Sequence, residues 1–148
     1  MDVDPRLLDK FILMTKHILV VDNSQAVVTG FRKIFKGEKF YVCAASRKEQ
    51  IMKLLKSKNI ALIFFDMNKY QIEGIRLFKI IKLLFPNIPI IAMTAYGNIF
   101  TAKNAIDIGA DAYLTKPFDI PEMLQTVHKL TGSQPATHLS TISLEVPL

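Results

Sequence analysis

The chain has 148 residues, half of them hydrophobic, so it can bury one sizeable core but is too short for two domains of ordinary size. Its hydrophobic runs, such as residues 60–65 and 88–93, are about as long as a strand and far shorter than the roughly 20 apolar residues of a membrane-spanning helix. No basic segment followed by an apolar stretch and a cleavage site opens the chain, and we therefore expect a cytoplasmic protein without a membrane partner.

The net charge of +6 is unevenly distributed along the chain. Residues 29–82 hold thirteen Lys and Arg against four Asp and Glu, a charge of +9, whereas residues 1–28 and 83–148 carry −1 and −2. The lysines are spread over three predicted helices without interleaved aromatic residues, and this pattern is typical of solvated helix faces. Direct binding of nucleic acid is therefore not expected.

The cysteine and histidine residues do not form a disulfide or metal-binding pattern. Cys43 is the only cysteine, so the chain has neither an intramolecular disulfide nor a cysteine zinc site. His17, His128 and His138 are too scattered along the sequence for a metal cluster.

Two terminal segments differ in composition from the rest of the chain. Residues 1–16 form a predicted N-terminal extension, in which a short helix over 5–16 begins after Asp4 as the N-cap. Residues 132–148 contain Ser, Thr and Pro, which predicts a flexible C-terminal tail or the start of a linker. The residues between them, 17–131, are predicted to form the folded domain.

Five short apolar runs rich in β-branched residues alternate with helical patterns in this domain. They predict strands at residues 17–21, 40–45, 60–65, 88–93 and 112–115. Strands that alternate with helices imply a parallel sheet covered on both faces, and the continuous hydrophobicity of these strands fits burial on both sides. In such sheets ligands bind outside the carboxyl ends of the strands, so the residues directly after each strand matter most.

Two of the helical segments each show one predicted buried face. In residues 24–36 the apolar side chains follow the i, i+1, i+4, i+7 and i+8 spacing of a helix that packs on a sheet. The same spacing recurs at Leu77, Phe78, Ile81, Leu84 and Phe85. Pro86 is expected to end the second of these helices.

The predicted helix ends carry capping residues. Ser46 and Glu49 have the spacing of a capping box at the start of the helix that follows the second strand. Asp119 is the expected N-cap of the last helix. Gly109 and Gly132 suit the C-terminal caps of the fourth and fifth helices of the alternating domain.

Polar side chains follow four of the five predicted strands. Asp22 and Asn23 come after the first strand, Asp66 after the third, Thr94 after the fourth and Lys116 after the fifth. Each residue alone has an ordinary explanation as a helix cap, a turn residue or a solvated charge. Together they would bring two carboxylates, an amide, a hydroxyl and an ammonium group to one edge of the sheet, and structural need alone does not explain that set.

With this arrangement the sequence resembles the response-regulator receiver family over about residues 17–131. The motifs that carry the resemblance are VVDNS at 20–24, Asp66 with Gly74, MTA at 93–95 and GADAYLTKPF at 109–118. The resemblance implies an α/β fold, a flavodoxin-like (βα)5 doubly wound parallel sheet with strand order 2-1-3-4-5. That order would place Asp22 and Asp66 on neighbouring strands.

The resemblance implies that Asp66 is the phosphoacceptor, which receives a phosphoryl group from a histidine kinase or a histidine phosphotransfer protein. A carboxylate that attacks phosphorus forms an acyl phosphate, and a hard divalent cation offsets the negative charge of the incoming group. The implied cofactor is Mg²⁺, held by Asp22, Asp66 and the backbone carbonyl of Asn68, with Asn23 as a further candidate ligand. Lys116 is expected to bind phosphoryl oxygens.

The resemblance also implies how the phosphorylated form signals. Thr94 is expected to hydrogen-bond to the phosphoryl group after transfer, and Tyr113 to turn inward when Thr94 moves. The Lys116–Pro117 peptide bond is expected to be cis. Phosphorylation would alter binding to a downstream protein target or effector domain through the fourth helix, fifth strand and fifth helix of the domain. Such a protein is not an enzyme with a separate substrate, because it catalyses only its own phosphotransfer and dephosphorylation.

The sequence departs from the family pattern at two places. Asn23 stands where the second carboxylate of the acidic pair is usual, and this weakens the expected metal site. Lys69 and Tyr70 replace the usual Met-Pro pair after the phosphoacceptor, and Lys69 is either solvated or paired with Asp66. These departures leave open a receiver-like module that binds partner proteins without phosphorylation.

Two other classes of protein fit the sequence less well. A phosphohydrolase of the haloacid-dehalogenase type needs a second aspartate two residues after the nucleophile, where this chain has Asn68. A flavin-binding flavodoxin needs a phosphate loop rich in Ser, Thr and Gly after the first strand, and residues 23–26 do not resemble one.

Overall fold

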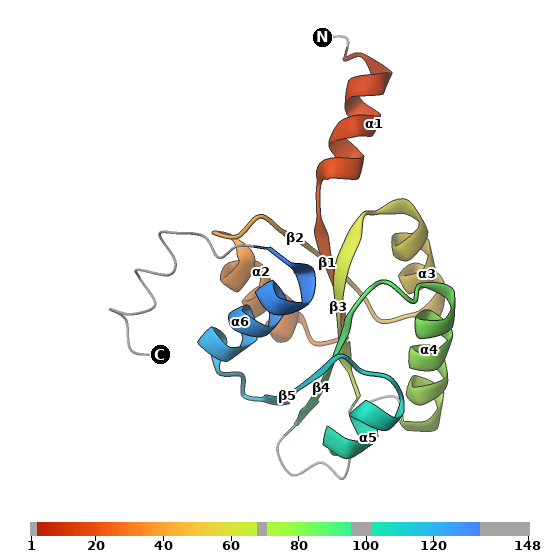
Figure 1. Cartoon of the computed structure of the whole chain (residues 1–148), viewed down its shortest axis with the longest axis vertical. Helices are drawn as coiled ribbons and strands as arrows, with labels where there is room; N and C mark the ends of the chain where they lie inside the picture. Colours follow the sequence, from red (N-terminus) through yellow and green to blue (C-terminus); the bar gives the residue numbers. More distant parts are fainter. Residues whose placement is uncertain (1–2, 68–70, 96–101, 134–148) are drawn as a thin grey trace.

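The computed structural model describes residues 3–67, 71–95 and 102–133, which form a parallel sheet and its covering helices (Figure 1). The strands are β1 (His17–Val21), β2 (Tyr41–Ala45), β3 (Ile60–Asp66), β4 (Ile90–Ala95) and β5 (Ala112–Lys116). The helices are α1 (Pro5–Met14), α2 (Gln25–Phe35), α3 (Lys48–Ser57), α4 (Gln71–Leu84), α5 (Ala102–Asp107) and α6 (Ile120–Thr131). All five predicted strands are present. The largest shift is at β4, which begins after Pro89, a residue with no N–H to donate to a neighbouring strand.

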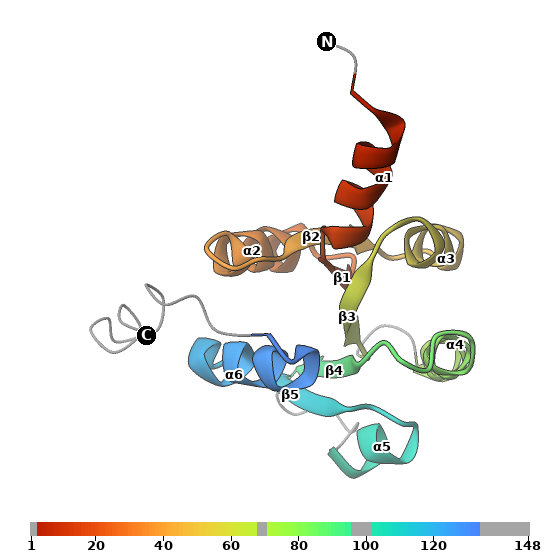
Figure 2. The same cartoon turned by 45° about the horizontal axis from the view of Figure 1, so that its top comes forward.

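The five strands are parallel and lie in the order β2-β1-β3-β4-β5. Helices α2 and α6 cover one face of the sheet, and α3, α4 and α5 cover the other (Figure 2). This flavodoxin-like arrangement confirms the predicted fold class and strand order. The strand order reverses between β1 and β3, so the carboxyl ends of these two strands flank the position where ligands bind in such sheets.

Alternate residues of the central strand β1 face opposite sides of the sheet. Ile18 and Val20 pack with α2 and α6, whereas Leu19 and Val21 pack with α3, α4 and α5. All four side chains are fully buried. Burial on both faces explains why the strand reads as a continuous apolar run.

The predicted helix faces are buried or partly buried with one exception. In α2 the buried residues are Val28, Phe31 and Phe35, and in α4 they include Leu77, Phe78 and Ile81. The prediction for Leu84 is wrong, because this side chain is 55% exposed. Leu84 is the last residue of α4, where the chain leaves the helix to turn toward β4, so it no longer faces the sheet.

The helix ends confirm most of the predicted caps. The side chains of Asp4, Ser24 and Asp119 accept hydrogen bonds from backbone N–H groups in the first turns of α1, α2 and α6. Gly109 and Gly132 have φ angles of 98° and 68°, a left-handed conformation that glycine adopts without a steric penalty.

The predicted capping box at Ser46 is wrong. The N-cap of α3 is Arg47, which makes no side-chain capping hydrogen bond, and the helix begins at Lys48. Ser46 therefore lies one residue too early to act as the N-cap. Glu49 still lies in the first turn, where its negative charge interacts favourably with the helix dipole.

Helix α1 extends away from the body of the molecule (Figures 1 and 2). It was predicted over residues 5–16 and ends two residues earlier, at Met14. Several of its apolar side chains are exposed, unlike those of α2 and α6. None of the helices in the described part of the chain combines the length and apolarity that crossing a bilayer requires.

Candidate functional site

The four ionisable or hydroxyl side chains predicted at the strand ends lie along one edge of the sheet. Asp22 directly follows β1, Asp66 is the last residue of β3, Thr94 is the second-to-last residue of β4, and Lys116 is the last residue of β5. These four strands are adjacent in that order, so the residues follow one another along the edge. Asp22, Asp66 and Thr94 are buried, with exposed fractions of 3%, 1% and 1%.

Lys116 is the cation of this site. Its Nζ donates a hydrogen bond to Oδ2 of Asp22 over 2.8 Å and lies 3.8 Å from Oδ1 of Asp66. When both carboxylates are ionised, these three side chains carry a net charge of −1. Because both carboxylate side chains are almost completely buried, an excess negative charge is costly there, and the site favours a further cation.

Asp22 is held in place by the start of α2. Its Oδ1 accepts a hydrogen bond of 2.8 Å from the backbone N–H of Ser24, and the Ser24 hydroxyl in turn accepts one of 3.3 Å from the N–H of Val27. This chain of contacts fixes the Asp22 carboxylate with one oxygen toward the helix and the other toward Lys116. Ser24 was not predicted to position Asp22, although an aspartate followed two residues later by a helix N-cap is a recurrent turn pattern.

The backbone on both sides of Asp66 is anchored to neighbouring strands. Asp66 pairs with Met93 in the register of β3 and β4, and the N–H of Met67 donates a 2.8 Å hydrogen bond to the carbonyl of Met93. Met67 is itself buried at 5% exposure. The Asp66 carboxylate is therefore presented by a rigid strand end.

Thr94 and Tyr113 lie on the same face of the sheet. Thr94 pairs with Thr115, and Tyr113 pairs with Ala92, which lies two residues before Thr94 on β4. Tyr113 is partly buried and packs against the hydrophobic cluster beneath α3, α4 and α5. The two residues are therefore diagonal neighbours on this face of the sheet.

The turn after Lys116 has the predicted geometry. The Lys116–Pro117 peptide bond is cis. Phe118 packs against the cluster beneath α2 and α6, with its ring centroid 5.6 Å from that of Phe31. This contact ties the chain directly after the lysine to the core.

Two predicted features of the site are not settled by these contacts. Asn23 is exposed in the loop after β1, beside Asp22, and its role as a metal ligand stays a prediction. Asn68, Lys69 and Tyr70 lie outside the described residues.

The donor set fits Mg²⁺ better than a metal with a full set of protein ligands. Among the described residues, no group of three or more His, Cys, Asp or Glu side chains could hold a metal ion. Mg²⁺ commonly uses one or two carboxylates and keeps several waters, so the two buried carboxylates of Asp22 and Asp66 match its requirements.

The comparisons with known proteins agree on one family. The response regulator receiver domain family matches residues 18–128 of this chain. The transcriptional regulatory protein ZraR of Escherichia coli K12 is 32% identical over 130 residues, which cover 88% of this chain and 28% of that protein. Sporulation initiation phosphotransferase F of Bacillus subtilis is 29% identical over 117 residues, which cover 79% of this chain and 94% of that protein.

Solved structures show the same fold. The N-terminal signal receiver domain of a response regulator from Bacteroides fragilis matches with a TM-score of 0.72 and 28% identity, over 80% of this chain and 98% of the other. A response regulator from Thermotoga maritima matches with a TM-score of 0.72 and 26% identity, over 81% of this chain and 100% of the other.

The parallel sheet, with a lysine between two buried aspartates at its carboxyl edge, defines a receiver-type signalling domain. This chain belongs to the response regulator receiver family. It spans 28% of the length of ZraR. Receiver domains interact with kinases or phosphotransferases and with effector domains.

Proposed function

We propose that this protein is a phosphorylation-dependent switch whose Asp66 accepts a phosphoryl group from a histidine kinase or a histidine phosphotransfer protein. The observation that carries the proposal is the position of the Lys116 ammonium, 2.8 Å from Asp22 and 3.8 Å from Asp66. Two buried carboxylates that share one cation are a poor way to stabilise a fold, and such groups cluster at functional sites.

The chemistry follows from the groups at the sheet edge. A carboxylate oxygen of Asp66 attacks the phosphorus of the donor's phosphohistidine, the P–N bond breaks as the P–O bond forms, and the donor histidine leaves with a proton on its imidazole, so that an acyl phosphate remains on Asp66. Asp22 and Asp66 would hold Mg²⁺, with the Asn68 carbonyl and Asn23 as further ligands, and the ion supplies positive charge that offsets the phosphoryl oxygens. Lys116 binds one of these oxygens, because its ammonium already lies within ion-pair distance of Asp66.

The output depends on Thr94 and Tyr113. The Thr94 hydroxyl donates a hydrogen bond to the phosphoryl group, and Tyr113 turns inward into the space that Thr94 leaves. This change biases an existing equilibrium toward the form that binds the downstream target or effector domain through α5, β5 and α6. Support comes from the shared face of Thr94 and Tyr113 on neighbouring strands.

A second candidate is a receiver-like module that binds partners without phosphorylation. Asn23 favours it, because an amide there contributes no charge to a metal site that then has only Asp22 and Asp66 as carboxylates. The two candidates differ in whether Asp66 can be phosphorylated at all.

The test is intact-mass spectrometry after incubation with acetyl phosphate, with and without Mg²⁺. We expect one added phosphoryl group that requires Mg²⁺ and is absent from Asp66→Asn. Asp107→Asn is the matched control, because Asp107 is exposed on α5 away from the sheet edge, and it should be modified like the wild type. Modification of Asp66→Asn, or no modification of the wild type at any Mg²⁺ concentration, would contradict the proposal.

The cellular location and the binding partners of the protein are also part of the proposal. We propose that the protein acts in the cytoplasm, has no separate substrate and does not bind nucleic acid directly. The spread of exposed lysines over several helices supports the last point.

A further inference from the structure

The edge of the sheet opposite the aspartates contains a cavity. Its volume is about 540 Å³, within the range of roughly 300–1,000 Å³ that is usual for ligand pockets. The lining residues come from the end of α1, the end of α2 and the start of β2. Because β1 separates the two edges by a strand length of about 17 Å, the cavity is distinct from the phosphoacceptor site.

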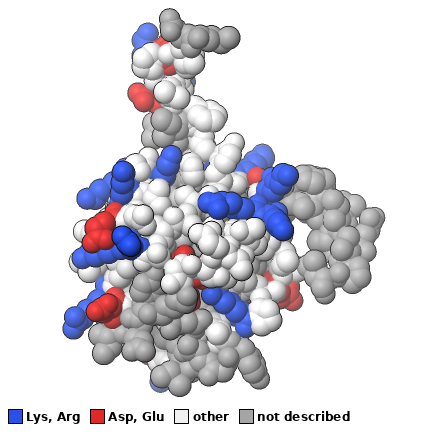
Figure 3. Space-filling view, turned by 180° about the vertical axis from the view of Figure 1, so that it is seen from behind, with Lys and Arg blue, Asp and Glu red and all other residues white. Residues whose placement is uncertain are grey.

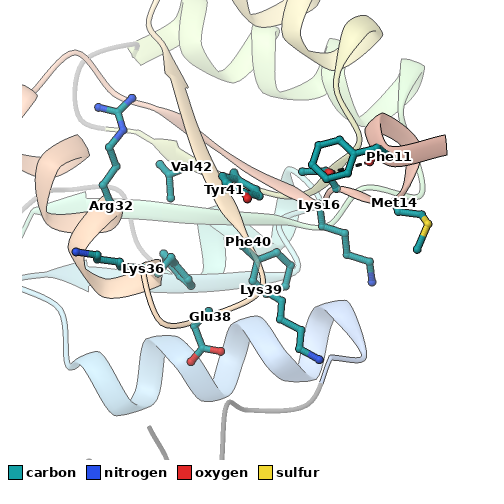
Figure 4. Close-up of a pocket in the computed structure, with 12 residues that line it drawn as sticks. Phe11, Met14, Lys16, Arg32, Lys36, Glu38, Lys39, Phe40, Tyr41 and Val42 are labelled. Atoms are coloured by element: carbon teal, nitrogen blue, oxygen red, sulfur yellow. Dashed lines mark hydrogen bonds between the residues drawn. The ribbon is translucent and has the colours of Figure 1, made fainter. Parts of the chain in front are cut away.

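The floor of the cavity is aromatic. Phe35 and Phe40 line its buried part and are 1% and 6% exposed. Tyr41 is 62% exposed at its rim (Figure 4). The exposed tyrosine ring offers an amphipathic surface on which an apolar side chain of a ligand can pack.

The rim of the cavity is basic. Lys16 and Lys39 lie on one side of the aromatic residues, and Arg32 and Lys36 lie on the other (Figure 4). All four are exposed, and none forms an ion pair with another described residue.

The one acidic residue of the cavity does not neutralise this rim. Glu38 points toward α6 (Figure 4), its side chain is only 3% exposed, and its Oε2 lies 3.5 Å from Nε2 of His128. Four cations thus surround an aromatic floor without a facing carboxylate.

Helix α1 adds an apolar wall beside the cavity. Phe11 and Met14 line the cavity and are 61% and 74% exposed, and Leu7 and Leu8 continue the exposed apolar surface along the helix at 61% and 50%. A helix of ten residues is marginal in water by itself, so four exposed apolar side chains on it indicate a partner that covers them.

The structure assigns this surface to an acidic, apolar peptide segment of a partner protein, an activity beyond the phosphoryl switch proposed above. Acidic side chains would pair with the rim lysines and Arg32, while apolar side chains would enter the cavity and cover α1. The assignment rests on charge complementarity at a concave aromatic site.

Other occupants match the surface less well. A second copy of this chain carries a net charge of +6, and the face in Figure 3 is rich in Lys and Arg, so self-association would oppose like charges. A bilayer surface offers anionic groups but, being flat, does not enter a concave site.

The test uses two fluorescein-labelled helical peptides of equal length, with leucines at every third and fourth position and either glutamates or lysines elsewhere. Fluorescence anisotropy with the full chain should show binding of the glutamate peptide that weakens with added salt, and no binding of the lysine peptide. The double variant Lys16→Glu/Lys39→Glu should bind the glutamate peptide at least tenfold more weakly. Its control is Lys53→Glu/Lys56→Glu, which makes the same charge change on exposed lysines of α3.

A second variant tests the aromatic part without changing charge. Tyr41→Ala should weaken binding at least threefold, whereas Leu83→Ala, at an apolar residue of α4 that is 79% exposed, should leave it unchanged. Acetyl phosphate should still modify all these variants, so failure here is distinguishable from failure of the phosphoacceptor assignment.

Three results would overturn the proposal. The first is that the glutamate peptide does not bind, or that the control variants lose as much affinity for it as the cavity variants do. The second is binding to anionic phosphatidylserine vesicles without binding to the peptide. The third is a concentration-dependent dimer, seen by sedimentation, that Tyr41→Ala abolishes.

Discussion

Replacing Lys116 with methionine removes the cation between Asp22 and Asp66 and keeps most of the side-chain volume. With an effective dielectric constant of about 20, the attraction is about 6 kcal/mol over the 2.8 Å to Asp22 and about 4 kcal/mol over the 3.8 Å to Asp66, before desolvation is subtracted. Desolvation cancels much of this gain. Loss of one partner of a buried pair costs about 3–5 kcal/mol, and Lys116 is 22% exposed, so we expect a loss near the lower value.

Urea denaturation at neutral pH in the presence of EDTA measures this loss. Lys116→Met should lower the free energy of unfolding by about 3 kcal/mol, whereas the control Lys103→Met, at an exposed lysine of α5, should change it by less than about 0.5 kcal/mol. A loss below about 1 kcal/mol would refute the reasoning that Lys116 neutralises the buried carboxylates.

The stabilisation of Lys116→Met by Mg²⁺ is a second test of the role of Lys116. Without the competing ammonium, the two carboxylates should bind the ion more tightly, so added Mg²⁺ should stabilise Lys116→Met more than the wild type. For either protein, the free energy of unfolding rises by about 2.7 kcal/mol when the Mg²⁺ concentration is one hundred times the Kd of that protein. Equal stabilisation of both proteins would show that Lys116 and Mg²⁺ do not compete for the same carboxylates.

Three further predictions concern other parts of the chain. Asn23→Asp should tighten Mg²⁺ binding by about tenfold to a hundredfold, measured by NMR titration, because it adds a negative charge beside the acidic pair. Asp111→Ala should lower the free energy of unfolding by about 1–3 kcal/mol in urea titrations, because the half-buried N–H of Ile90 loses its acceptor at 2.8 Å and Lys82 loses its ion pair. His17→Gln should reduce the loss of stability that follows acidification below about pH 6.5. Burial, and after it the charge of Lys58, lowers the pKa of His17 in the folded protein. The unfolded chain therefore binds a proton at a higher pH than the folded protein does, and acid favours unfolding.

Each of these predictions has a contrary result. Equal Mg²⁺ affinities with Asn and Asp at position 23 would show that this residue is not a metal ligand. An Asp111→Ala protein as stable as the wild type would mean that water replaces the carboxylate at Ile90. Identical pH profiles of stability for His17→Gln and the wild type, between pH 7.5 and 5, would remove His17 as a source of acid sensitivity.

The fold was predictable because the strands are buried on both faces. Residues such as Ile18 to Val21 form a continuous apolar run, and a run of that length between helical patterns has few alternatives to a central parallel strand. The errors fall at element ends. Strand β4 begins after Pro89, two residues later than predicted, and the N-cap of α3 is Arg47 rather than Ser46. Both boundaries depend on contacts with neighbouring segments, which the local sequence pattern does not contain.

The site was predictable in its members but not in its contacts. Strand ends place Asp22, Asp66, Thr94 and Lys116 along one edge, as expected from the order of parallel strands. That Lys116 lies closer to Asp22 than to Asp66 depends on side-chain conformations, which the sequence does not specify.

The basic and aromatic cavity was missed for a related reason. It depends on the direction in which α1 leaves β1, and hydrophobic spacing within residues 5–14 carries no information about that direction. The excess of basic residues between positions 29 and 82 was visible in the sequence, but only the folded chain brings Arg32, Lys36 and Lys39 beside Lys16.

Chemical mapping of the phosphorylated residue tests the central claim most directly. Borohydride reduces an aspartyl phosphate to homoserine, so a protein treated with acetyl phosphate and Mg²⁺, then reduced and digested, reports the site by peptide mass spectrometry. We predict homoserine at position 66 and at no other aspartate. Homoserine at another position, or unmodified Asp66 under conditions that phosphorylate a known receiver domain in the same tube, would contradict the account.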